Sequence, residues 1–141
     1  MEWLPALVEL LETAYANWGL EPPDLVVPVP LHPKRLQERG FNQSGLLAKE
    51  FSRRLGLPIS FDLLVRKKWT EPQTRLNRKE RLENVKGAFG LCEADAVRGR
   101  RILLLDDVFT TGTTLSECAK TLKRAGGSEV HVLTVTRAVP D

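Results

Sequence analysis

The chain has 141 residues, 42% of them hydrophobic, and 21 Lys and Arg against 18 Asp and Glu give a formal net charge of +3. This length and composition indicate one globular domain that is long enough to bury a core. The sequence holds no apolar run of membrane-spanning length, no signal-peptide-like basic start and no cysteine framework around Cys92 and Cys118, so we expect a cytoplasmic protein with no membrane span.

Charge is unevenly distributed along the chain. Residues 1–24 hold five acids and no Lys or Arg, whereas residues 66–86 hold eight basic residues against three acids. A local excess of positive charge can attract nucleic acid or a polyanionic small ligand. Trp69 is the only aromatic residue in this stretch, so the aromatic interleaving that a base-stacking surface needs is not supported.

The spacing of hydrophobic residues predicts the N-terminal elements. Apolar residues at helical spacing predict a helix over residues 3–16, ended by Gly19 and the Pro22-Pro23 pair. We assign residues 1–24 to this helix, packed on the core, and residues 25–141 to the main domain. Residues 25–30 read as a short strand, and its prolines belong at the strand's end rather than in a central position.

Further elements follow in order. A helix is expected over residues 44–55, with Leu47, Phe51 and Leu55 on one face, stopped by Gly56. Residues 59–65 predict one or two short strands. Residues 66–86 form a long polar stretch without clear periodicity, which indicates either a binding loop or a solvated loop. A short strand at 88–91 comes next, and a helix over 115–125 and a strand over 130–136 complete the pattern.

The segment at 102–114 carries the strongest signal. Its apolar run at 102–105 predicts a buried strand of a parallel sheet that ends at Asp106 and Asp107. A loop of threonines around Gly112 follows and leads into the next helix. Ligands of open α/β sheets lie beyond the carboxyl ends of the strands, so the acids and this loop both lie where a ligand is expected.

The residue types in this segment suit a sugar phosphate. Gly112 allows a tight turn, and backbone N–H groups, threonine hydroxyls and the helix dipole can bind a phosphate without a lysine. Like charges repel, so the two acids must serve another part of the ligand. They can accept hydrogen bonds from ribose hydroxyls or hold a hydrated Mg²⁺.

Other nucleotide-binding motifs do not fit. A Walker loop would need Gly-Lys-Ser/Thr, and a dinucleotide fingerprint would need three spaced glycines. The acid pair lies too near the C-terminus for a phosphorelay receiver. An ordinary strand–turn–helix, in which the threonines only cap the helix, stays an alternative.

The segment closely resembles the phosphoribosyl-diphosphate (PRPP) signature of the type I phosphoribosyltransferases. Further pieces are similar to ComF-type phosphoribosyltransferase-like proteins, in order: Pro28-Val29-Pro30-Leu31-His32, Arg39-Gly40-Phe41-Asn42-Gln43, Pro72-Gln73-Thr74, Asn84-Val85 and Ala88-Phe89. The resemblance implies an α/β fold with a mostly parallel twisted sheet flanked by helices. We expect neither the N-terminal zinc module that many ComF-type proteins carry nor a glutaminase domain.

The resemblance also implies a reaction and a site. It is the Mg²⁺-dependent transfer of a phosphoribosyl group from PRPP to a nitrogen acceptor, with release of pyrophosphate. Asp106 and Asp107 would be the catalytic pair and would hold Mg²⁺ through water. The 5′-phosphate would bind Thr110, Thr111, Gly112, Thr113 and Thr114. Pyrophosphate would meet His32, Lys34, Arg35, Arg39, Arg75, Arg78, Lys79 and Arg81.

Each cationic residue also has a plainer interpretation. Lys34 and Arg35 can be surface charge, His32 can be a loop hydrogen-bonding group, and Arg39 and Asn42 can cap the following helix. The resemblance further implies a homodimer whose 66–86 loop closes over the site. The alternative function is a non-catalytic PRPP- or nucleotide-binding protein that acts in DNA uptake with competence proteins or single-stranded DNA. Direct nucleic-acid binding through the 66–86 loop is a third possibility.

Overall fold

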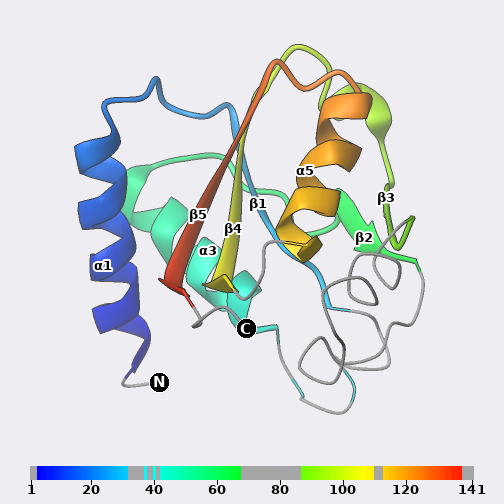
Figure 1. Ribbon diagram of the computed structural model, residues 1–141. Helices are drawn as coiled ribbons and strands as arrows, with labels where there is room; N and C mark the ends of the chain where they lie inside the picture. Colours follow the sequence, from blue (N-terminus) through cyan, green and yellow to red (C-terminus); the bar gives the residue numbers. More distant parts are fainter. Residues whose placement is uncertain are drawn as a thin grey trace.

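A computed structural model describes residues 3–31, 37, 40, 42–67, 87–109 and 113–137 of the chain. The elements form an α/β fold, drawn in Figure 1. In chain order they are α1 (Trp3–Trp18), β1 (Leu25–Pro28), α3 (Gln43–Leu55), β2 (Leu64–Arg66), β3 (Phe89–Leu91), a short 3₁₀ helix (Ala94–Ala96), β4 (Arg101–Phe109), α5 (Thr113–Arg124) and β5 (Glu129–Arg137).

A parallel sheet of order β1-β4-β5 forms the centre of the described fold. Leu25 of β1 pairs with Ile102 of β4, and Ile102 in turn pairs with Val130 of β5. Parallel neighbours need a crossover connection, and helix α5 provides it between β4 and β5. Strands β2 and β3 form a separate antiparallel pair in which Arg66 lies opposite Phe89.

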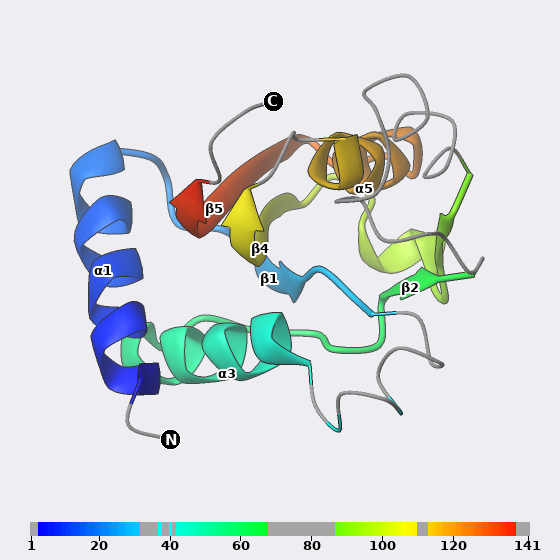
Figure 2. The same ribbon diagram turned by 60° about the horizontal axis from the view of Figure 1, so that its bottom comes forward.

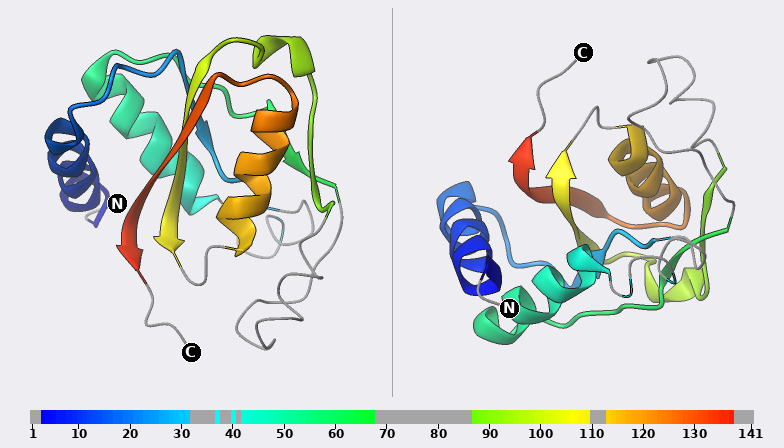
Figure 3. Two further views of the ribbon diagram at one scale, coloured as in Figure 1. Left: turned by 45° about the horizontal axis from the view of Figure 1, so that its top comes forward. Right: turned by 90° about the horizontal axis from the view of Figure 1, so that it is seen from below.

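Side-chain alternation along β4 divides the core into two layers. Ile102 and Leu104 pack with α5 and the β2–β3 pair, whereas Leu103 and Leu105 pack with α1 and α3. Figures 2 and 3 show α5 and α3 on opposite sides of the sheet. Residues 102–105 of β4 are covered on both faces and buried, which explains the continuous apolar run in the sequence.

Pro28 fits in β1 because of the direction in which an N–H group at its position would point. Val29 donates its N–H to Leu105 of β4, while Val26 donates on the other side, to Pro58. Alternate residues of a strand face opposite neighbours, so Pro28 would also face away from β4. Pro28 is the last residue of the strand, as expected, and it removes no bond from the β1–β4 ladder.

Two boundaries in the PRPP-like segment differ from the sequence-based expectation. Strand β4 does not end at the acids but continues to Phe109, because its pairing with β5 extends through Asp106 opposite Thr134. Backbone hydrogen bonding does not depend on the side chain's charge, so a strand can continue past the apolar part of its sequence. Helix α5 begins at Thr113 rather than at 115, which places two of the threonines in its first turn.

Helix α3 has well-defined ends. The side chain of Asn42 accepts a hydrogen bond from Ser44 N–H as the N-cap, and Gly56 adopts φ +67° at the C-cap. Leu47 and Phe51 are fully buried against the sheet. Leu55, which was expected on the same face, is 36% exposed because it is the last residue of the helix and lies past the apolar layer.

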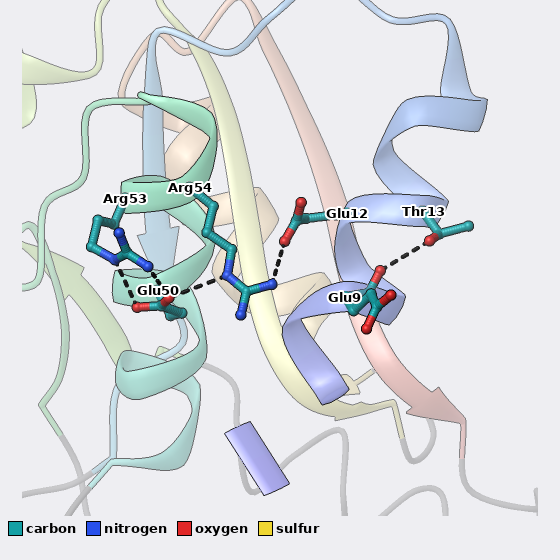
Figure 4. A network of polar contacts seen from close by, with 6 residues as sticks. All are labelled: Glu9, Glu12, Thr13, Glu50, Arg53 and Arg54. Atoms are coloured by element: carbon teal, nitrogen blue, oxygen red, sulfur yellow. Dashed lines mark hydrogen bonds and ion pairs between the residues drawn. The ribbon is translucent and has the colours of Figure 1, made fainter. Parts of the chain in front are cut away.

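Helix α1 packs against α3 and β5 through Val8 and Leu11. The Tyr15 ring meets the Phe51 ring edge-on, with centroids 5.6 Å apart. Figure 4 shows an ion-pair network at the same interface: Arg54 lies 2.8 Å from Glu12 of α1 and 3.2 Å from Glu50 of its own helix. Hydrogen bonds from Arg53 and then Arg54 lower the pKa of Glu50 to about 2.

The described helices include none that is both long and apolar enough to cross a membrane. The two cysteines are free thiols, Cys92 exposed and Cys118 buried. Burial raises the pKa of the Cys118 thiol well above its usual value.

Phe51 should be among the side chains on which stability depends most. Replacing it with Ala removes a fully buried ring from the α1–α3 layer, so we expect Phe51→Ala to lower the free energy of unfolding by about 3–5 kcal/mol. Leu55→Ala, on the same helix, should cost less than about 1 kcal/mol. Urea denaturation of both variants measures the difference, and equal losses would contradict this division of the helix.

Candidate functional site

A pocket of about 230 Å³ opens at the carboxyl ends of β1 and β4. This edge of the sheet faces the viewer in Figure 2. The position is the one at which open α/β sheets bind ligands. The lining residues come from the ends of five elements: Val29, Pro30, Leu31, Asn42, Gln43, Ser44, Arg66, Asp106, Asp107 and Thr114.

Asp106 and Asp107 both line this pocket but are not equivalent. Strand alternation places Asp106 on the face of Leu104, toward α5, and Asp107 on the face of Leu105, toward α3. Asp106 Oδ1 accepts the Asp107 N–H at 2.9 Å. Both carboxylates nevertheless reach the same hydroxyl, Ser44 Oγ at the start of α3.

Ser44 of α3 joins the two acids. Its Oγ donates to Asp106 Oδ1 at 2.6 Å and lies 3.4 Å from Asp107 Oδ1. It also accepts the Asp107 N–H at 3.3 Å. This hydroxyl is buried, and Ser44 lies 62 and 63 positions before the two acids in the sequence.

The environment of Asp106 disfavours its charge. Desolvation raises the pKa of Asp106 to about 7, and a hydrogen bond with the Asp107 side chain and repulsion from its charge act in the same direction. The hydrogen bonds from the Ser44 hydroxyl and the Asp107 N–H oppose this rise in the pKa but do not cancel it. Near neutral pH the carboxyl is therefore close to its midpoint, and strongly perturbed groups of this kind concentrate at functional sites.

Asn42 fixes the start of α3 against β1. Its Oδ1 accepts Ser44 N–H at 3.0 Å, and its Nδ2 donates to the Val29 carbonyl at 3.2 Å. The interpretation of Asn42 as a helix cap is thus confirmed. The same contacts fix the backbone of Ser44 beside the acid pair.

Helix α5 begins at the same pocket. Thr114 lines it, and Thr113 is the first residue of the helix, with no acidic residue in the first turn. A helix N-terminus presents free N–H groups and positive potential, which suits an anion. Thr110, Thr111 and Gly112 lie outside the described residues. Of the predicted phosphate turn, the structure therefore describes Thr113 and Thr114.

The predicted cationic residues also lie outside the described part of the chain: His32, Lys34, Arg35, Arg39, Arg75, Arg78, Lys79 and Arg81. A different cation lines the pocket, namely Arg66 at the end of β2. Its guanidinium lies 5.1 Å from the centroid of the Phe89 ring, which fixes it on the core-facing side of the hairpin.

Sequence reasoning did not select Ser44 or Arg66. Ser44 directly follows the Arg39-Gly40-Phe41-Asn42-Gln43 motif, and that neighbourhood was the available signal. In the sequence Arg66 is the first residue of the basic stretch at 66–86, and the structure places it at the end of a strand. Arg66 and Asp106 share one pattern: each is a charged residue that directly follows the apolar residues of a strand.

The donor set at the pocket is compatible with Mg²⁺. The described residues contain no group of three or more His, Cys, Asp or Glu that could hold a metal by themselves. Mg²⁺ usually takes one or two carboxylates, several waters and the phosphates of a substrate. Asp106 and Asp107 match that pattern, and the remaining ligands would come from the bound phosphate compound and water.

Comparison with known proteins agrees with this geometry. A family model described as the phosphoribosyl transferase domain matches residues 42–139. Competence protein F of Haemophilus influenzae is 40% identical over 120 residues, 84% of this chain and 52% of that protein. DNA utilization protein YhgH of Escherichia coli is 39% identical over 132 residues, 92% of this chain and 57% of that protein. The chain thus spans about half the length of these relatives.

Solved structures show the same fold. The purine phosphoribosyltransferase from Pyrococcus horikoshii superposes with a TM-score of 0.57 at 18% identity, covering 97% of this chain and 77% of that one. The matched family segment includes Asn42, Ser44, both acids and the start of α5. The chain therefore belongs to the phosphoribosyl transferase domain family, has the type I phosphoribosyltransferase fold, and has competence protein F among its relatives.

Proposed function

We propose that this protein binds PRPP together with Mg²⁺ and transfers the phosphoribosyl group to a nitrogen acceptor. The observation that carries the proposal is the shared pocket of Asp106, Asp107 and the N-terminus of α5 at the carboxyl edge of the sheet. A ligand with ribose hydroxyls next to a phosphate complements both parts. The family to which the chain belongs supports the same class of ligand.

The roles of the residues follow from their chemistry. The carboxylates of Asp106 and Asp107 accept hydrogen bonds from the ribose hydroxyls. Thr113, Thr114 and the free N–H groups of α5 bind the 5′-phosphate, together with the predicted Thr110, Thr111 and Gly112. Arg66 supplies positive charge for the pyrophosphate, along with the predicted basic residues of the two loops.

In the reaction, the bond between ribose C1 and the pyrophosphate oxygen breaks and a bond from C1 to the acceptor nitrogen forms. Positive charge develops on the sugar, as in glycoside cleavage, and the nearby carboxylates stabilise it. The acceptor loses a proton, and pyrophosphate leaves with the electron pair of the broken bond. Bound Mg²⁺ would neutralise part of the leaving group's charge while Asp106 and Asp107 hold its water ligands.

A second candidate function rests on the relatives. Competence protein F and DNA utilization protein YhgH carry names that refer to DNA uptake or use, and each is about 40% identical to this chain. In that role the pocket would bind PRPP or a nucleotide without turnover, and the partners would be competence proteins or single-stranded DNA. PRPP binding without pyrophosphate release in the presence of any acceptor would favour this candidate.

The homodimer likewise stays a prediction, which light scattering can test.

The acid pair provides the direct test of the proposal. Asp106→Asn and Asp107→Asn should each weaken PRPP binding at least about tenfold, because a hydrogen bond to a charged group contributes about 1.5–3 kcal/mol. Isothermal titration with PRPP and Mg²⁺ measures the affinity, and pyrophosphate release measures turnover. Asp24→Asn is a matched control, since Asp24 contacts β4 only at its opposite end, through Arg101 N–H. Unchanged PRPP affinity in both site variants would contradict the proposal.

The raised pKa of Asp106 predicts a specific pH dependence of stability. A carboxyl whose pKa is higher in the folded state stabilises the fold at low pH, and that contribution is lost as pH rises through about 7. Asp106→Asn has no such group. Its stability relative to the wild type should therefore rise by roughly 2–4 kcal/mol between about pH 4.5 and pH 8. Urea denaturation at both pH values measures this, and a pH-independent difference would refute it.

Arg66 should act on the pyrophosphate end of the ligand. We expect Arg66→Gln to weaken PRPP binding about tenfold and to leave the affinity for ribose 5-phosphate, which lacks pyrophosphate, within about twofold. Arg53→Gln removes an equally charged side chain from the exposed face of α3 and is the control. Equal losses for the two ligands would assign Arg66 to another role.

A further inference from the structure

Ser44 occupies a position where one hydroxyl contacts both acids. It is 4% exposed and lies in the first turn of α3. A hydroxyl has one proton to donate, and the distances of 2.6 Å to Asp106 Oδ1 and 3.4 Å to Asp107 Oδ1 assign that proton to Asp106. Its lone pairs accept the Asp107 N–H at 3.3 Å.

The hydroxyl is itself held in place from β1. The Ser44 N–H bonds to Asn42 Oδ1, Asn42 Nδ2 bonds to the Val29 carbonyl, and Val29 N–H bonds to the carbonyl of Leu105 in β4. These contacts, together with the Ser44–Asp106 bond, close a ring that passes through β1, α3 and β4. A network that is satisfied at each step restricts the side-chain positions of its members.

The hydrogen bonds to Asp106 are concentrated on one of its oxygens. Oδ1 accepts both the Ser44 hydroxyl and the Asp107 N–H. A carboxylate has about four lone-pair directions on its two oxygens, and these two contacts fix the carboxylate through Oδ1. A carboxylate fixed in this way is oriented before a ligand hydroxyl donates a hydrogen bond to it in the same pocket.

We propose that Ser44 is a positioning residue that holds Asp106 in the orientation that binds the sugar hydroxyls of the ligand. Ser44 acts through Asp106 and does not need to touch the ligand. This inference rests on the proposed function, because it assumes that the acid pair meets a ribose.

The same helix contains a matched control. Ser52 is 3% exposed, and among the described residues its Oγ has no hydrogen-bond partner. Ser52→Ala and Ser44→Ala thus each remove one buried hydroxyl from α3. Only the second removes a contact with the acid pair.

The experiment measures binding of two ligands by isothermal titration at constant Mg²⁺: ribose 5-phosphate, and inorganic phosphate, which has no sugar. Ser44→Ala should weaken ribose 5-phosphate binding about tenfold and leave phosphate binding within about twofold. Ser44→Thr, which keeps the hydroxyl, should restore most of the affinity. Ser52→Ala should match the wild type for both ligands.

A double-mutant cycle guards against a merely structural effect. If Ser44 acts through Asp106, Ser44→Ala should cause little further loss of ribose 5-phosphate binding in an Asp106→Asn background. Additive losses, equal losses for both ligands, or wild-type affinity in Ser44→Ala would each overturn the inference. A wild-type protein that binds ribose 5-phosphate no better than phosphate would instead overturn the proposed function, so the two failures are distinguishable.

Discussion

Two neighbouring carboxylates that directly follow the buried apolar run of β4 constrain the rest of this structure. Removing Asp106 from water raises its pKa to about 7, so its charged form destabilises the fold. The surroundings offset this cost only in part, through the Ser44 hydroxyl and the Asp107 N–H. A pair of acids kept under these conditions indicates a functional requirement, because an amide would be the more stable choice near neutral pH.

The fold supplies the offsetting groups by bringing helix N-termini to one edge of the sheet. Helices α3 and α5 run back from the carboxyl ends of the strands, so Gln43 and Thr113, their first residues, lie at that edge. Neither helix has an acidic residue in its first turn, which leaves the positive ends of both dipoles toward the pocket. Helices cover both faces of β4 and hold the backbone that leads to the acids. The site itself consists of side chains at the carboxyl edge of the sheet.

The sequence predicted the elements well where hydrophobic period and stop signals agreed. Asn42 and Gly56 delimit α3 because capping depends on local backbone geometry. The predicted bounds were less accurate where pairing between distant segments, rather than the local hydrophobic pattern, decided where an element ends. Strand β4 extends past its apolar run because β5 continues to pair with it. Ser44 and Arg66 were missed because neither residue type marks a site by itself; the signals lay in their neighbours, a motif before Ser44 and an apolar strand before Arg66.

By itself, the sequence determined the α/β class, the strand that carries the acid pair and the threonine-rich start of the next helix, because these depend on local spacing and residue type. It also carried the resemblance to the type I phosphoribosyltransferases. Only the tertiary structure decided which side chains meet those acids. Ser44 is 62 residues away from Asp106, and Arg66 comes from a separate hairpin. Contacts across such distances follow from how the layers pack around the sheet, and no local pattern encodes them.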